Sequence, residues 1–337
     1  MIEILLFFIG ASLLLYVLLG GSDYGAGILE MLPAGKLREA QKHLINEAMG
    51  PVWEANHVWL IVLVVILFMG FPGVFVPLMT YLHVPMLALL VGIVIRGATF
   101  TFRHYDAVQE EKSQRVYTWL FSGSSIWTAF WLGVIAASLG RGLIDVETRD
   151  VWSAYFAPWI GWYPAAVGVF VICIFAFLAS VYLIGETEEP ELRRLFLRRA
   201  AVFNVLVVLA GGLVFAASYG EKENLPAVFF AHPLTLGVLV VATGLFVALW
   251  VFVQKHRTAL TRIVAAGQVT LILLGWWLLY APNALITAQG KINFYEAAAP
   301  EATLWQLVLA LLVGSCFIFP SLFFLLKVFK TKGREEF

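Results

Sequence analysis

The stretch NEAMGPVWEANHVWLIVLVVILF, residues 46–68, changes from polar to lipid-like within the length of one possible helix. Every residue from Val58 to Phe68 is apolar. A helix of about 20 mostly apolar residues, rising about 1.5 Å per residue, crosses the hydrocarbon core of a bilayer. The segment 51–70 is therefore predicted to span a membrane, with Glu54 and His57 near its polar end.

The composition of the whole chain supports this interpretation. Of the 337 residues, 61% are apolar and 13% are charged, and the mean hydropathy is +0.88, which is typical of a membrane protein that crosses the bilayer many times. Acidic and basic residues balance at 22 each, and no basic tail or patch indicates binding of nucleic acid. No segment between the predicted spans is long enough for a soluble catalytic domain, so residues 1–337 are predicted to form one integral membrane domain.

Nine apolar runs are long enough to cross the bilayer as helices. The alternating ten-residue pattern of a membrane β-barrel is absent, so an all-α polytopic protein is predicted. The opening Met-Ile-Glu-Ile lacks the basic segment of a secretory signal, and the first run is therefore retained as a span. The predicted spans are 2–23, 51–70, 75–98, 117–138, 164–185, 199–218, 232–253, 263–281 and 303–326.

Lys and Arg residues predict the orientation, because cytoplasmic loops of membrane proteins retain them in excess. All but four of the 22 basic residues lie in or beside the first, third, fifth and seventh connections and the C-terminal tail. The four exceptions are Arg141, Arg149, Lys222 and Lys291. The N-terminus is therefore predicted outside and the C-terminus in the cytoplasm.

Ionisable residues inside predicted spans are the candidate functional groups, because charge is costly in a bilayer and usually serves a function there. Asp23 lies near the cytoplasmic end of the first span and Glu54 near that of the second. Glu47, Glu54 and His57 are spaced by seven and three residues, which places them along one stripe if the helix continues through Pro51. Such a series of carboxylates and imidazole can pass protons. Glu47 and His57 could instead be interfacial groups that reach water.

Metal and haem binding by this chain alone have little support in the sequence. Cys173 and Cys316 stand singly in separate apolar runs, without metal-type spacing. Only His57 and His83 lie well inside predicted spans, at opposite depths, whereas two histidines that share one haem need matching depth.

Four segments of the first 140 residues resemble subunit II of the cytochrome bd-type quinol oxidases. They are GSDYGAG at 21–27, NEAMGPVWEANHVWLI at 46–61, IRGATFTFR at 95–103 and WLFSGSSI at 119–126. The second segment is the most specific, through Pro51, Trp53, Glu54, Asn56, His57, Trp59 and Leu60.

The resemblance implies a subunit of a terminal oxidase in a bacterial cytoplasmic membrane, folded as two four-helix bundles with one peripheral helix. It implies no haem in this chain, whereas the larger partner, subunit I, would bind two b-type haems and one d-type haem and oxidise quinol on the outer side. This chain would contribute assembly with that subunit and part of a cytoplasmic proton path, and in some members of the family an oxygen route or a bound quinone.

Single residues take roles from the same resemblance. Asp23 and Glu54 match acidic positions of the family's proton path, and Trp59 matches a tryptophan associated with the oxygen route. Arg96 and Arg103 are interpreted as cytoplasmic anchors or ion pairs at the subunit interface. The chain departs from the family pattern at Gly20 to Asp23, where one of two common carboxylates is missing.

Two other functions remain open from the sequence. Asp23 and Glu54 could be the proton or cation sites of a secondary transporter, although no internal repeat or pair of broken helices is visible. Alternatively, the same acids could serve only to stabilise a structural scaffold.

Overall fold

A computed structural model describes the backbone of residues 1–49, 53–105, 111–222 and 224–335. Within these ranges, the side chains at 53, 54, 104, 105, 111, 323 and 325–335 are not described. The first span consists of α1 (Ile2–Leu15), the π-helix η1 (Tyr16–Gly20) and α2 (Gly21–Met31). The other long helices are α4 (Trp53–Gly70), α6 (His83–Tyr105), α7 (Glu111–Gly140), α9 (Trp162–Ile184), α10 (Pro190–Ser218), α12 (Pro233–Gln254), α13 (Thr258–Tyr280) and α14 (Glu301–Glu335).

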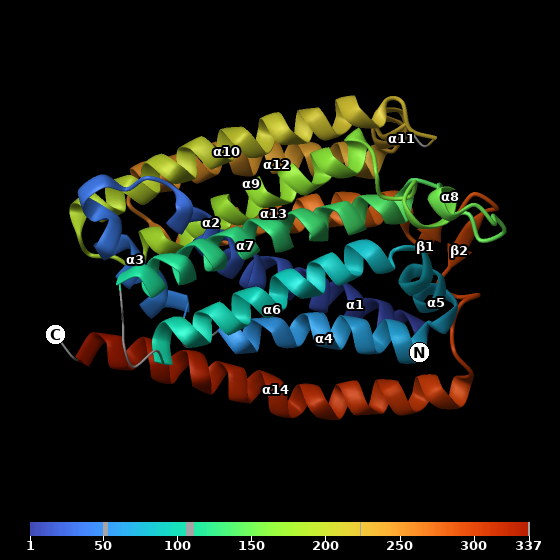
Figure 1. Cartoon of the computed structure of the whole chain (residues 1–337), viewed down its shortest axis with the longest axis horizontal. Coiled ribbons are helices and arrows are strands. Elements are labelled where there is room, and N and C mark those ends of the chain that lie inside the picture. The colour runs from blue at the N-terminus through green and yellow to red at the C-terminus, as the bar shows by residue number, and fades with distance from the viewer. Residues whose placement is uncertain (50–52, 106–110, 223, 336–337) are drawn as a thin grey trace.

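Shorter elements connect these helices. They are η2 (Gly35–Leu37), α3 (Arg38–Met49), α5 (Pro72–Tyr81), α8 (Val151–Tyr155), α11 (Leu225–Ala231), β1 (Asn283–Ile286) and β2 (Lys291–Asn293). The two strands form an antiparallel hairpin that pairs Leu285 with Ile292. Figure 1 shows α3 at one end of the bundle and α5, α8, α11 and the hairpin at the other.

Within the described residues, eight helices are long and apolar enough to cross a membrane. A ninth candidate is the pair formed by α4 and α5, which is bent by 114°. The prediction of an all-α membrane protein is confirmed, with eight or nine candidate spans. The first helix begins and the last helix ends at opposite ends of the bundle (Figure 1).

The third predicted span, 75–98, has the wrong boundaries. The chain forms α5 up to Tyr81, leaves helical geometry at Leu82 and begins α6 at His83. Pro85 explains the break, because proline has no backbone N–H and its ring clashes with the carbonyl of the preceding turn. Hydropathy alone does not register this interruption, since the residues on both sides of it are apolar.

Several helices extend beyond the predicted apolar runs. Helix α10 begins at Pro190 rather than at residue 199, and α13 begins at Thr258 rather than at residue 263. Proline in the first turn of α10 starts the helix without loss of a hydrogen bond, because the first N–H groups of a helix are unpaired. The first turns of these helices are polar, so a prediction from hydropathy does not include them.

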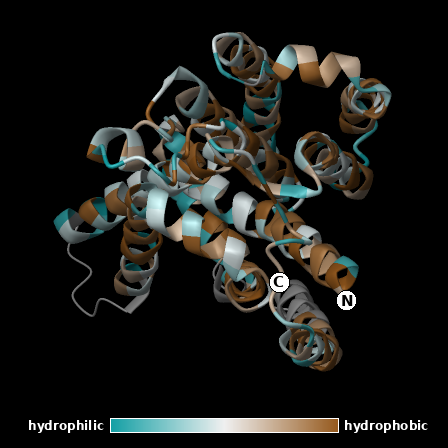
Figure 2. Ribbon diagram, turned by 90° about the vertical axis from the view of Figure 1, so that its right-hand side faces the viewer, coloured by the Kyte–Doolittle hydropathy of each residue, from teal (hydrophilic) through white to brown (hydrophobic). Residues whose placement is uncertain are grey.

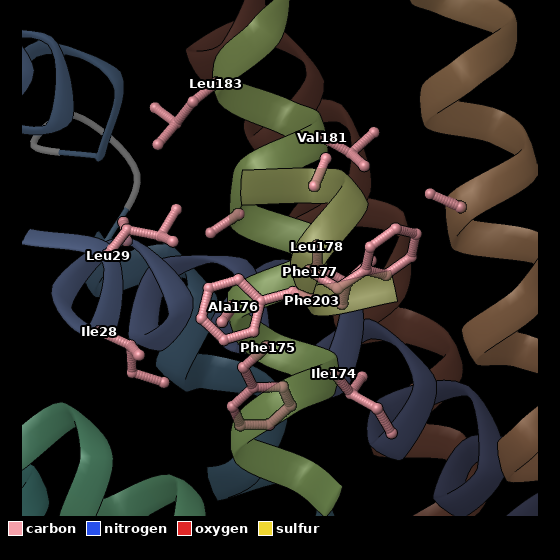
Figure 3. Close-up of a cluster of buried hydrophobic side chains, with 14 of the residues drawn as sticks. Ile28, Leu29, Ile174, Phe175, Ala176, Phe177, Leu178, Val181, Leu183 and Phe203 are labelled. Atoms are coloured by element: carbon pink, nitrogen blue, oxygen red, sulfur yellow. The ribbon is translucent and has the colours of Figure 1, made fainter. Parts of the chain in front are cut away.

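Helix α9 forms the centre of the bundle. It packs against α10, α7 and α2, and Figure 3 shows its side chains Phe175, Phe177 and Leu178 beside Leu29 of α2 and Phe203 of α10. Most of its residues from Cys173 to Ile184 are buried. The sequence of α9 is accordingly apolar on all sides, as expected of a helix surrounded by other helices.

The outer helices carry apolar residues on the exterior, and in the end-on view of Figure 2 they are coloured mostly as hydrophobic. Helix α14 packs against α4 and α1 and exposes large side chains such as Leu309 and Phe317. In water such a surface would be unfavourable, whereas in a bilayer it faces lipid tails.

Candidate functional site

Helix α2 approaches α9 and α7 with its backbone, because glycines lie at its contact points. A Cβ atom at Gly25 would overlap the carbonyl oxygen of Phe175, and one at Gly27 would overlap the Ser125 hydroxyl. All residues from Gly21 to Glu30 are buried as a result. This close packing places Asp23 inside the bundle rather than at its surface.

Asp23 forms an ion pair with Arg96 of α6. Arg96 Nη1 donates to Asp23 Oδ2 at 2.8 Å and Nη2 donates to the Asp23 carbonyl oxygen at 3.0 Å. Arg96 Nε donates to the Ser125 hydroxyl at 3.1 Å. The guanidinium lies 4.9 Å from the ring centroid of Tyr24 and 4.7 Å from that of Phe121. Charge, hydrogen bonds and aromatic faces therefore all fix its position.

A second ion pair follows one step along the same two helices. Arg103 Nη1 donates to Glu30 Oε2 at 3.0 Å, and Nη2 lies 2.9 Å from Oε1. Glu30 is seven residues after Asp23, and Arg103 is seven after Arg96. Sequence reasoning missed Glu30. The signal that could have found it is this equal spacing of two acids and two arginines on neighbouring helices.

Arg96 and Arg103 therefore differ from their expected placement as anchors or interface groups. Their side chains are 2% exposed and pair with acids of the same chain. The physical reason is that an acid buried in an apolar bundle needs an opposite charge beside it. A buried, ion-paired arginine and an exposed cytoplasmic anchor differ in burial, and burial cannot be read from a single sequence.

The C-terminal end of α2 is held by side chains from two other helices. Gln41 Nε2 donates to the Leu29 carbonyl at 2.8 Å, and Arg199 Nη1 donates to the same oxygen at 3.2 Å and to Gln41 Oε1 at 3.0 Å. The Leu29 carbonyl also accepts from the backbone N–H of Leu32 at 3.1 Å, so the two side chains add donors to a carbonyl in the last turn of the helix. Arg199 thus has a structural contact beyond the topological role expected for a basic loop residue.

Helix α3 lies outside the candidate spans and contacts the end of α2. Its Lys42 is near both charges of the second ion pair, because Arg103 and Glu30 each act on it. Burial first, and then the positive charge of Arg103, lower the pKa of Lys42 below its usual 10.5.

The expected stripe of Glu47, Glu54 and His57 is described only in part. Glu47 Oε2 lies 3.2 Å from His43 Nδ1, and both side chains are exposed. Residues 50–52, including Pro51, lie outside the described residues, as do the side chains of Trp53 and Glu54. Helices α3 and α4 stand on either side of this gap. The continuity of the stripe thus stays a prediction.

His57 lies in a cluster of three hydrogen-bonded rings. Its Nε2 is 3.1 Å from the Tyr24 hydroxyl, which is 3.0 Å from the Tyr16 hydroxyl. Tyr16 and Tyr24 are 1% and 0% exposed. Sequence reasoning named His57 but missed both tyrosines, because residues eight apart differ by about 80° in direction on a regular α-helix.

Asn56 and Trp59 lie on either side of His57 on the same helix. Both are buried, and the Trp59 ring centroid lies 5.8 Å from that of Phe319 on α14. The indole N–H of Trp59 finds no acceptor among the described residues. Asn56 places its backbone beside Gly20 of η1. The specific segment of α4 therefore packs against both the first span and the last helix.

Among the described residues, His57 and His83 are not placed to share one haem. His57 is in the second turn of α4 and already faces Tyr24, whereas His83 begins α6 at the opposite end of the bundle (Figure 1) and contacts the Thr80 carbonyl through Nδ1 at 2.8 Å. Within the part of the chain that the structure describes, no group of three His, Cys, Asp or Glu side chains could hold a metal ion. An open cavity of about 470 Å³ lies at the N-terminal end, beside Glu3 and Tyr295, away from Asp23.

The fold and the site define a class: a helical, multi-pass membrane protein with two buried ion pairs and a hydrogen-bonded group of two tyrosines and a histidine. Comparison with known proteins narrows this class. The family model for cytochrome bd terminal oxidase subunit II matches residues 1–329. The chain belongs to this bacterial family.

Individual relatives agree with the family match. The chain is 26% identical over 251 residues to the cytochrome bd ubiquinol oxidase subunit 2 of Bacillus subtilis (strain 168), covering 73% of this chain and 70% of that protein. It is 24% identical over 207 residues to the cytochrome bd-I ubiquinol oxidase subunit 2 of Escherichia coli (strain K12), covering 60% and 53%. A chain of the bd oxidase structure from Geobacillus thermodenitrificans has the same fold, with a TM-score of 0.78, 19% identity and coverage of 97% and 98%.

Proposed function

We propose that this chain assembles with a haem-bearing subunit I into a quinol:oxygen oxidoreductase of the bacterial cytoplasmic membrane, and that it contributes a cytoplasmic proton path. The family membership and the fold shared with a bd oxidase chain support the assembly. Residues 1–337 form one membrane domain of two four-helix bundles and a peripheral helix in this proposal. The charge pattern supports an outer N-terminus and a cytoplasmic C-terminus.

The observation that carries the proton path is the concentration of polar groups in the first two spans. Tyr16 and Tyr24 are buried in the first span beside the ion pair of Asp23 and Arg96, and His57 faces Tyr24 from α4. The surrounding bundle is apolar, and groups that can hold protons are costly there unless they serve a function. A scaffold alone would need no such concentration.

The energetic benefit of this path follows from where protons are taken up and released. Haem b and haem d of subunit I supply the redox chemistry when bound: quinol gives up electrons and releases protons outside, and oxygen is reduced to water. If the protons for water come from the cytoplasm, charge separates across the membrane without a pump. Each charge that crosses is worth about 2.3 kcal/mol per 100 mV. This chain then delivers protons while its partner transfers electrons.

The acids have different tasks in this path. A proton that binds Asp23 would cancel its charge and break the ion pair with Arg96, which lies 2.8 Å away. We therefore assign proton transfer to Glu54 and His57, and assign to Asp23 the placement of Arg96 and of the neighbouring Tyr24. Glu47, which is exposed beside His43, collects protons at the surface.

Trp59 supports the secondary proposal of an oxygen route or a subunit contact. Its ring is buried between α4 and α14, where apolar oxygen could pass more readily than water. Trp53 and Asn56 flank the same segment. The resemblance also includes a bound quinone in some members of the family, and the cavity beside Glu3 lies at the other end of the bundle from this segment.

The variant Glu54→Gln tests the proton path. The two-subunit complex is purified, and quinol-driven oxygen consumption is measured per haem d. We expect turnover to fall at least about a hundredfold, the low end for loss of a proton-transferring group, with unchanged haem content. The matched control is Glu39→Gln on the exposed side of α3, which should retain full turnover. Wild-type turnover in Glu54→Gln would remove Glu54 from the path.

A further inference from the structure

Three ring side chains form a compact polar cluster inside the first two spans. The Tyr24 hydroxyl lies between the other two members, 3.0 Å from the Tyr16 hydroxyl and 3.1 Å from His57 Nε2. The ring centroids are 5.8 Å apart for Tyr24 and His57 and 6.4 Å apart for the other two pairs. Each ring therefore touches both others. We call this group the Tyr-His cluster.

The backbone of the first span is distorted at the place that builds this cluster. In a regular α-helix, residues eight apart differ by about 80° in direction, because each residue adds about 100°. The π-helical turn η1 begins at Tyr16, and a π-bulge adds one residue to a turn. With that extra residue, Tyr16 and Tyr24 are related as residues seven apart, within about 20° of one face. The π-turn thus aligns the two hydroxyls.

Neighbouring residues accommodate the distortion. Ser22 Oγ donates to the Leu19 carbonyl at 2.8 Å, which gives a partner to a carbonyl within the widened turn. Gly20 leaves room for the Tyr16 ring, since a Cβ there would lie only 3.2 Å from it. π-bulges occur frequently at functional sites. A distortion that aligns two buried hydroxyls with an imidazole points to a role beyond packing.

The cluster can take up a proton without losing a hydrogen bond between its members. With Nε2 unprotonated, His57 accepts from Tyr24, and Tyr24 accepts from Tyr16. When a proton is added to Nε2, His57 donates to Tyr24, and Tyr24 turns its own proton toward the Tyr16 oxygen. One proton is gained, and the two internal hydrogen bonds remain with reversed direction. Loss of the proton reverses the sequence.

Only the imidazole of the cluster approaches the surface of this chain. Tyr16 and Tyr24 are buried, whereas His57 is half-buried and lies on α4 next to Val58 and one turn before Ile61, which are 36% and 61% exposed. A group that exchanges protons with a neighbouring subunit has to lie at such a position. The two tyrosines cannot make that contact themselves.

We propose that His57 holds the proton in transit from the cytoplasmic acids to the haem-bearing subunit, and that Tyr24 and Tyr16 are positioning residues that orient the imidazole and reverse their hydrogen bonds as it is loaded. This inference rests on the proposed proton path and adds the two tyrosines and the π-turn to it. Asp23 and Arg96 lie beside Tyr24 as a mutually neutralising pair, so the cluster itself carries the change in charge.

Tyr24→Phe in the purified two-subunit complex tests the proposal. The variant removes the central hydroxyl but keeps the ring, which stacks on Phe175 at 6.0 Å. We expect kcat per haem d to fall at least about tenfold, the KM for quinol to stay unchanged, and the solvent isotope effect on kcat to rise as proton transfer becomes limiting. His57→Gln should behave alike, and Tyr16→Phe should show a weaker effect in the same direction. Tyr182→Phe removes a hydroxyl outside the cluster and should change none of these values.

The outcomes separate this inference from the proposed function. Tyr24→Phe with wild-type kcat and isotope effect overturns the inference, and if Glu54→Gln is slow in the same assay, the proton path itself stands. Wild-type rates in both variants overturn the path as well. A slow Tyr24→Phe beside a normal Glu54→Gln supports the cluster and moves its proton source to another acid. Because rates are counted per haem d, a loss of assembly cannot be mistaken for a loss of proton transfer. A variant that is only less stable would leave the isotope effect unchanged, and this result would count against the proposal.

Discussion

Asp23 of α2 and Arg96 of α6 form an ion pair of 2.8 Å in the interior of the bundle, with exposed side-chain fractions of 1% and 2%. Glu30 and Arg103 repeat this arrangement seven residues further along both helices. The second ion pair lies seven residues, about 10.5 Å, further along both helices, so the two helices run parallel. The two pairs thus fix the register of α2 against α6.

Removal of Arg96 should be more harmful than removal of the whole pair. Arg96→Met leaves the Asp23 carboxylate buried without its partner, and loss of one member of a buried pair costs about 3–5 kcal/mol. The double variant Asp23→Leu/Arg96→Met should recover much of this loss, since apolar replacements of buried pairs are often neutral. Thermal unfolding of the purified complex, followed by haem absorbance, measures both effects. Arg149→Met, on an exposed loop, is the control, and equal melting temperatures for Arg96→Met and Arg149→Met would contradict the prediction.

Replacement of Arg103 by lysine should lower the stability of the protein. The guanidinium donates to Glu30 Oε2, makes a second ion contact with Oε1 and lies 5.5 Å from the Phe121 ring centroid. A lysine ammonium is a point charge that cannot make all three contacts at once. We expect Arg103→Lys to lose about 1–3 kcal/mol of stability, the cost of an unsatisfied buried group. Arg38→Lys, on the exposed face of α3, should melt as the wild type does, and no difference between the two variants would refute the argument.

The helices could be predicted from the sequence because lipid imposes a simple requirement. Any span needs about 20 apolar residues. Each long helix overlaps one of the nine apolar runs that meet this requirement. The break before His83 escaped prediction because Pro85 interrupts hydrogen bonding without lowering hydropathy. The hairpin of β1 and β2 also escaped, since its register depends on contacts that two short strands cannot specify alone.

Only those site residues could be predicted that are individually costly to place in an apolar run. Asp23 stood out because a carboxylate in an apolar run requires explanation. Its partner lies 73 residues away, and no single sequence states which helices are neighbours. The Tyr-His cluster was hidden for a different reason: a regular helix would separate Tyr16 and Tyr24 by about 80° in direction, and the π-turn reduces this angle.

Lys42 should destabilise the complex at neutral pH. Burial and the charge of Arg103 lower its pKa in the folded protein, so the folded state releases this proton at lower pH than the unfolded state. Stability linked to Lys42 therefore rises with pH in the window between the lowered value and 10.5. We expect Lys42→Met to melt above the wild type at pH 7, with a gap that narrows as the pH approaches 10.5. A gap that is absent, or that widens with pH, would show that the sign is wrong.

Gly25→Ala should impair the assembly of the helix bundle although alanine favours helix formation. A Cβ atom at this position would overlap the backbone carbonyl of Phe175, so α2 and α9 would have to separate at the centre of the core. Overpacking of this kind typically costs about 1–3 kcal/mol, and more where backbone must move. Gly10→Ala in the same span is the matched control, because a Cβ there meets nothing within 4 Å and alanine is the better helix former by about 1 kcal/mol. The yield of haem-loaded complex and its melting temperature should fall for Gly25→Ala and hold or rise for Gly10→Ala. If both variants behave alike, close contact between α2 and α9 does not hold this region together, and the burial of Asp23 needs another cause.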